Sequence, residues 1–98
     1  MNQKKEIDLY QKKIKEILNI NFYIEIEDLT NNKMLNIYPK NSDLEKEEGC
    51  TLVINIDRKT GKAKGYSRNK DFILKGPGLK KVVEEAFKIE KLEKLFKT

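Results

Sequence analysis

The chain has 98 residues, a net charge of +5, one cysteine, and neither histidine nor tryptophan. Without histidine it cannot use a histidine general base, a serine–histidine or cysteine–histidine pair, or a histidine metal site, and one cysteine cannot build a zinc or iron–sulfur centre. The length suits one domain over residues 1–98, and we expect that domain to hold no cofactor and no metal.

The composition also indicates a compartment and qualifies the positive charge. No apolar run reaches the ~18 residues that span a bilayer, and the first residues, MNQKKEIDLYQKK, lack the apolar core of a secretory signal. A single cysteine cannot form an internal disulfide, so we expect a cytoplasmic protein with no membrane partner. Lysine greatly outnumbers arginine, and isoleucine and asparagine are frequent, a profile typical of AT-rich genomes whatever the function. The positions of the basic residues therefore carry more information than their total.

The first half of the chain predicts one helix and two strands. Apolar residues recur at spacings of three and four over residues 3–18, which predicts an amphipathic helix. Strict alternation over FYIEIED, 22–28, predicts a strand, and a turn centred on Asn31-Asn32 separates it from a second strand over 34–39. An acidic loop follows at 40–49.

The second half of the chain predicts further strands and a second helix. Strands are expected at 51–57 and, more weakly, at 62–68, with a short fifth strand at 71–75 as an option. The GPG sequence at 76–78 breaks the chain before a long helix over 79–97. The short connections between strands predict a two-layer α+β domain in the order α-β-β-β-β-α. Its antiparallel sheet has four strands, or five, and both helices cover one face.

The apolar stripe of the last helix drifts around the helix axis beyond its midpoint. Ile89, Leu92, Leu95 and Phe96 continue at helical spacing but lie off the stripe begun by Leu79. Either the helix bends near Lys88 and wraps its own core, or its last turns contact something else. A homodimer through Ile89, Leu92, Leu95 and Phe96 is the second of these interpretations.

The stretch DRKTGKAKGYSRN, 57–69, predicts a hairpin with a loop at Arg58–Gly61, because Gly61 can adopt a left-handed conformation. In that register Ile56 pairs with Ala63 and Ile54 with Gly65, facing the helices. Small residues there would let a helix approach the sheet closely.

The opposite face of the same hairpin would carry a row of cations with one aromatic residue. Its members are Lys62, Lys64, Tyr66 and Arg68, extended at the tip by Arg58 and Lys59 and beyond the strand by Lys70. Such a row can track phosphates while Tyr66 stacks on a base, or it can simply keep an outer strand soluble. If the strands follow a 1-2-3-4 meander, the row lies clear of Glu25 and Glu27.

A second basic cluster surrounds the start of the last helix. In KGPGLKK, 75–81, Lys75, Lys80 and Lys81 flank a helix N-terminus, and such termini bind anions. A plain solvated loop is the competing interpretation.

Two nucleic-acid-binding families share short features with this chain. Lys64-Gly65-Tyr66 looks like the start of the ribonucleoprotein-1 segment, but the base-stacking aromatics that should follow are replaced by Ser67 and Arg68, so we reject that family. The layout of a helix, antiparallel strands and a helix with lysines at its start is similar to the double-stranded-RNA-binding domain. The likeness is one of layout, without that family's histidine-bearing loop.

The sequence holds no recognisable constellation of catalytic residues, so we expect a non-enzymatic protein. The leading hypothesis is nucleic-acid binding, to DNA or RNA, through the hairpin at 58–70 and the N-terminus of the last helix. The alternative is a protein-binding modulator: an inhibitor, adaptor or accessory factor of a phage or other mobile genetic element.

Overall fold

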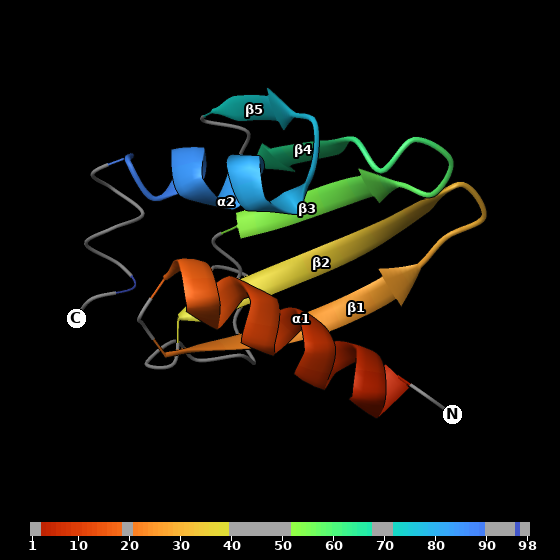
Figure 1. The fold of residues 1–98 in the computed structure, drawn as a ribbon, viewed down its shortest axis with the longest axis horizontal. Helices are drawn as coiled ribbons and strands as arrows, with labels where there is room; N and C mark the ends of the chain where they lie inside the picture. The colour runs from red at the N-terminus through yellow and green to blue at the C-terminus, as the bar shows by residue number, and fades with distance from the viewer. Residues whose placement is uncertain (1–2, 19–20, 40–51, 68–71, 90–95, 97–98) are drawn as a thin grey trace.

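The computed structural model of the protein describes residues 3–18, 21–39, 52–67, 72–89 and 96. Within these residues two helices flank five strands along the chain (Figure 1). The elements are α1 (Gln3–Ile17), β1 (Phe22–Asp28), β2 (Asn32–Pro39), β3 (Leu52–Asp57), β4 (Ala63–Tyr66), β5 (Ile73–Gly76) and α2 (Leu79–Ala86).

The five strands form one antiparallel sheet in the order β1-β2-β3-β4-β5. Each strand pairs with its neighbour in sequence, as a meander does, and both helices lie on the same face of the sheet (Figure 1). The predicted α+β class and the layout with a helix at each end are therefore confirmed, and the optional fifth strand is present.

The core lies between the helices and the helix-facing side of the sheet. Alternation along each strand sends every second side chain to this side, where apolar burial contributes about 1.5–3 kcal/mol for each large side chain. α1 contributes Ile14, and α2 contributes Val82, Val83 and Ala86. The strands contribute Phe22, Ile24, Ile26, Leu35, Ile37, Leu52, Ile54 and Ala63.

A close approach of α2 to the sheet occurs at Gly65. A Cβ atom built on Gly65 would lie 2.6 Å from Cγ1 of Val82, which is closer than carbon atoms can pack. The register also pairs Ile54 with Gly65 and Ile56 with Ala63, as the sequence predicts. The prediction that small residues on β4 admit a helix is thus confirmed.

The turn between β1 and β2 is tighter than the sequence predicts. The backbone N–H of Leu29 donates to the carbonyl of Asn32 over 2.9 Å, which closes the turn around Thr30 and Asn31. β2 therefore begins at Asn32, two residues before the predicted strand, and Lys33 becomes a strand residue.

The prediction of one helix over 79–97 is wrong, because α2 ends at Ala86. Phe87 leaves the helical conformation with φ −84° and ψ 5°, and the N–H groups of Lys88 and Ile89 donate to carbonyls three residues back. Phe96 meets Phe87 edge to face, with ring centroids 4.9 Å apart. The helix thus ends just before the position where the sequence places a bend, and Phe96 of the drifting stripe is buried in the chain's own core.

None of the helices in the described part of the chain is long and apolar enough to cross a membrane. The predicted acidic loop at 40–49 and Cys50 lie outside the described residues.

Candidate nucleic-acid interface

The loop between β3 and β4 is held in one conformation by hydrogen bonds from its own backbone. Gly61 has φ 78°, the left-handed region that glycine favours, and its N–H donates to the carbonyl of Asp57 over 2.8 Å. Oδ1 of Asp57 accepts the N–H groups of Lys59 and Thr60 at 2.8 and 3.2 Å. These bonds, that from Lys59 foremost, hold the pKa of the Asp57 carboxyl below its usual range.

The outer face, meaning the sheet face turned away from α1 and α2, carries the predicted basic row of β4. Lys64 pairs with Asn55 of β3 on one side and with Lys75 of β5 on the other. Directly facing like charges repel each other. Lys62, Lys64 and Lys75 are all exposed to solvent, so an anion bound there would relieve that repulsion.

A second row crosses the outer face one step further along the strands. Tyr66 pairs with Val53 of β3 and with Ile73 of β5. Ile73 is 53% exposed and Tyr66 is half-buried, whereas Val53 is buried. An aromatic ring and an exposed apolar side chain therefore lie beside the lysine row.

The meander order keeps the acids of β1 away from this basic region. Through successive pairs, Glu27 is separated from Lys64 by Met34 of β2 and Asn55 of β3. Three strand spacings of about 4.8 Å place the Cα positions of these two residues ~14 Å apart. Glu25 accepts a hydrogen bond from the hydroxyl of Tyr38 over 2.7 Å. The condition set by the sequence, a 1-2-3-4 order that leaves the basic row clear of Glu25 and Glu27, is met.

A shallow hollow of about 390 Å³ opens at the end of the basic row. Its lining combines three cations with two amides and one acid: Lys62, Lys64, Lys75, Asn32, Asn55 and Asp57, completed by Ala63 and Gly76. The Asp57 carboxylate opposes an anion there, although its Oδ1 atom is already occupied by the two turn amides.

Arg58, predicted as a phosphate ligand, is engaged within the protein. Its Nη2 lies 2.6 Å from Oδ1 of Asp28, and its Nε donates to the carbonyl of Leu29 over 3.1 Å. Its backbone N–H donates to the carbonyl of Asn31 over 3.0 Å. The loop between β3 and β4 is thus fastened to the turn between β1 and β2, and Figure 1 shows the two side by side.

The structure does not gather all the predicted site residues on one face. Lys62, Lys64, Tyr66 and Lys75 share the outer face, and Lys59 is exposed in the loop beside it. Lys80 and Lys81 are exposed on α2, in the helix layer. Arg68 and Lys70 lie outside the described residues.

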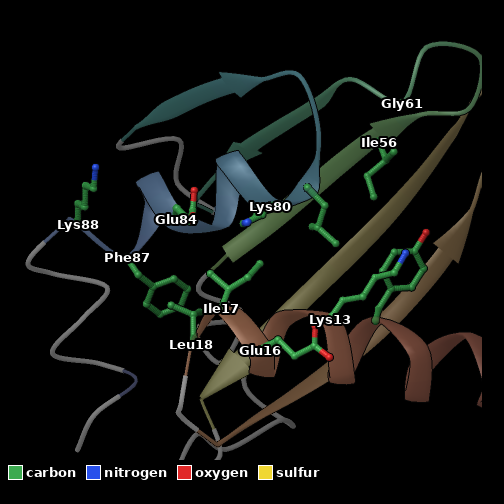
Figure 2. Close-up of a pocket in the computed structure, with 12 residues that line it drawn as sticks. Lys13, Glu16, Ile17, Leu18, Ile56, Gly61, Lys80, Glu84, Phe87 and Lys88 are labelled. Atoms are coloured by element: carbon green, nitrogen blue, oxygen red, sulfur yellow. The ribbon is translucent and has the colours of Figure 1, made fainter.

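A separate groove of about 1100 Å³ runs between α1 and α2 (Figure 2). Ile56 of β3 contributes to its lining, with Ile17 and Leu18 from the end of α1 and Leu79 from α2. Charges of both signs also line it: Lys13, Lys80, Lys88, Glu16 and Glu84. This mixture selects neither an anion nor a cation.

An ion-pair network on the helix-facing side of the sheet was not predicted from the sequence. Lys33 lies against the carboxylate of Glu6 in α1 and 3.7 Å from Asp28, which also binds Arg58. Burial, helped by the nearby Arg58 charge, lowers the pKa of the Lys33 ammonium. Alternation along β2 could have revealed this network. Once β2 begins at Asn32, Lys33 lies on the same helix-facing side of the strand as the buried Leu35 and Ile37.

Among the residues that the structure describes, no three His, Cys, Asp or Glu side chains are grouped so as to hold a metal ion. No protein-family model matches the chain, and no match was found among curated proteins or solved structures.

Proposed function

We propose that this protein binds nucleic acid, without catalysing a reaction, through the outer face of β4 and β5. Lys62, Lys64 and Lys75 would contact phosphates, and Tyr66 would contact a base or sugar. The observation that carries the proposal is the pairing of Lys64 with Lys75 on a face where Glu25 and Glu27 lie at the opposite edge. We expect the protein in the cytoplasm, because its one cysteine cannot form an internal disulfide.

The proposed interface contains fewer residues than the sequence predicts. Lys80 and Lys81 are left out because α2 lies on the helix side of the sheet, so one bound strand would have to pass around the sheet edge to reach them. Arg58 contributes indirectly, since its side chain fixes the loop that carries Lys59.

The test is a titration of labelled DNA and RNA oligonucleotides with two charge-reversal variants. One variant carries Lys62→Glu, Lys64→Glu and Lys75→Glu on the outer face. The matched control carries Lys5→Glu, Lys12→Glu and Lys15→Glu at exposed positions of α1. Each variant lowers the net charge from +5 to −1, because every substitution removes one positive charge and adds one negative charge.

We expect the outer-face variant to lose at least about tenfold in affinity near 150 mM salt, and the α1 control to lose less than about threefold. Equal losses would show that net charge alone attracts the oligonucleotide. If the unaltered protein binds no oligonucleotide, the proposed function is wrong.

The groove between the helices favours a second candidate, the protein-binding modulator. Ile17, Ile56 and Leu79 contribute apolar side chains to this open groove, and hydrophobic grooves of this kind receive helices of partner proteins. If the protein is folded but binds none of the oligonucleotides, that result would favour this candidate. The homodimer prediction stays untested for Leu92 and Leu95, which lie outside the described residues, while Phe96 is buried in this chain's core.

A further inference from the structure

We infer that the nucleic acid bound by this protein is single-stranded, an inference that rests on the proposed function and deepens it. Two observations carry it. The hairpin tip is fastened to a neighbouring turn, and the outer face presents a lysine row beside a row with an aromatic ring.

The first observation concerns the shape of the hairpin tip. A free two-stranded ribbon can enter the major groove of a DNA duplex, which is about 12 Å wide. Here Arg58 bonds Asp28 at 2.6 Å and the carbonyls of Leu29 and Asn31 at 3.1 and 3.0 Å. The turn between β1 and β2 therefore moves with the loop between β3 and β4.

The consequence is a blunt end four strands wide. Four strands at a spacing of about 4.8 Å measure ~14 Å between the outer backbones alone, before side chains are added. This end of the sheet is too broad for the major groove, and the lysines lie on the sheet face instead of on the projecting tip.

The second observation concerns the two rows of the outer face. Lys64 and Lys75 form one row, and Tyr66 and Ile73 form the next, two residues along the strands. Rows on one face of a strand are about 7 Å apart, since each residue advances the chain ~3.4 Å. A single strand crossing β4 and β5 can set its phosphates over the lysine row and turn an unstacked base toward Tyr66. A duplex keeps its bases stacked inside and cannot use that row.

The hollow at Lys62 lies at the far side of the lysine row from Tyr66. The amides of Asn32 and Asn55 can both donate and accept hydrogen bonds there. These groups suit a ribose hydroxyl or the Watson–Crick edge of a base, and that edge is turned outward only by an unpaired nucleotide.

The experiment compares single strands of about 12 nucleotides, as DNA and as RNA, with the corresponding blunt duplexes at about 50 and 150 mM salt. We expect the single strands to bind at least about tenfold more tightly than the duplexes. The slope of log affinity against log salt should be about −2, or ~0.7 for each of three contacted phosphates. The DNA and RNA arms distinguish the two sources of single strand.

A variant of the aromatic row provides an independent readout. Tyr66→Ala should reduce single-strand affinity by about tenfold. It should also remove the quenching of intrinsic tyrosine fluorescence that a stacked base causes. Tyr23→Ala is the matched control, because Tyr23 is on the outer face at the β1 edge and is 37% exposed. Circular dichroism checks that both variants fold, and the comparison on the unaltered protein needs neither of them.

The outcomes separate this inference from the function on which it rests. Duplexes that bind as tightly as single strands would overturn the inference and leave nucleic-acid binding in place. Equal losses for Tyr66→Ala and Tyr23→Ala would overturn the role of the aromatic row. Failure of every oligonucleotide to bind would overturn the inference together with the proposed function.

Discussion

Gly65 is explained by packing, although its sequence context, Lys64-Gly65-Tyr66, looks like a nucleic-acid-binding segment. On β4 the lysine and the tyrosine point to the outer face, while the glycine lies under Val82 of α2. The three adjacent residues therefore serve two sides of the sheet. Alternation along a strand separates their roles more sharply than their proximity in sequence suggests.

We predict that Gly65→Ala lowers the free energy of unfolding by about 1–3 kcal/mol, the usual cost of overpacking. The added Cβ would lie 2.6 Å from Cγ1 of Val82, so either α2 or β4 must shift. Urea unfolding measures the change. Val82→Ala removes the opposing methyl groups, so the double variant should cost less than the sum of the two single variants. Strict additivity would contradict the contact.

The carboxylate of Asp57 makes the hairpin loop sensitive to acid. Because the N–H groups of Lys59 and Thr60 lower the folded-state pKa of Asp57, its stabilising effect is present above the unfolded value, about pH 4. That effect is lost as the pH falls through the folded pKa. We therefore predict that Asp57→Ala is less stable than the unaltered protein at pH 7 and that the gap narrows near pH 2. Urea unfolding at both pH values measures the gap.

Asp57→Asn is the control for this prediction, since its amide oxygen can still accept the two turn amides without titrating. It should retain more stability at pH 7 than Asp57→Ala does. A gap between the unaltered protein and Asp57→Ala that stays constant down to pH 2 would contradict the role of the ionised carboxylate.

At the scale of elements, the two loops at one end of the sheet act as a unit. The Arg58 guanidinium joins them, and Asp28 extends the network through Lys33 to Glu6 of α1. Arg58 and Asp28 remain about half exposed, so water screens their attraction. The contribution of Arg58 lies as much in the direction of its hydrogen bonds as in its charge.

We predict that Arg58→Lys lowers the free energy of unfolding by only about 0.5–1 kcal/mol, because lysine keeps the charge but lacks the planar array of donors. The more specific readout is hydrogen exchange. The N–H of Arg58 bonds across to the turn between β1 and β2, and the N–H of Leu29 bonds within that turn. Both should exchange faster in the variant. Lys59→Ala in the same loop is the control and should leave their exchange unchanged. Unaltered exchange in Arg58→Lys would show that the loops are joined by their backbones alone.

The elements that alternation and turn residues specify locally could be predicted from the sequence. The register of β3 with β4 followed from Gly61 and from the alternation of Ile54 and Ile56. The end of α2 could not be predicted, because Phe96 is apolar at helical spacing whether the helix continues to it or ends at Ala86, with Phe96 packed against Phe87. Periodicity reports which side chains are buried and does not report the path that buries them.

The candidate site could be predicted only in part, for a similar reason. The sequence groups Lys75 with Lys80 and Lys81, its near neighbours along the chain. The sheet pairs Lys75 with Lys64 instead, because Lys75 belongs to β5 and the other two belong to α2. Which lysines share a face depends on whether residues 73–76 pair as a strand, and a run of four residues leaves that choice to tertiary packing.

At the scale of the whole molecule, charge is distributed unevenly over the outer face. Glu25 and Glu27 occupy the β1 edge, and strand spacing places Glu27 ~14 Å from Lys64 of β4. That separation exceeds the screening length of about 8 Å at physiological salt and is shorter than the ~30 Å at 10 mM. The acids should therefore influence a bound strand only in dilute salt.

We predict that Glu27→Gln changes oligonucleotide affinity by less than about twofold at 150 mM salt and raises it more clearly at 10 mM. Lys64→Gln should weaken binding at both salt concentrations, since it removes a direct phosphate contact. Fluorescence anisotropy titrations measure both variants. A large effect of Glu27→Gln at 150 mM would place the bound strand across the whole sheet and not on β4 and β5 alone.

One of the two helices that cover the sheet precedes the strands in sequence and the other follows them, and this order has a consequence for biosynthesis. A ribosome makes α1 before the strands but α2 only after all five. Leu52, Ile54 and Ala63 therefore emerge with their apolar side unprotected until Val82 and Val83 have been made. During this interval the nascent chain exposes the apolar side of half of its sheet. Chaperones would bind the chain at this stage, and slow translation would favour aggregation by prolonging the exposure.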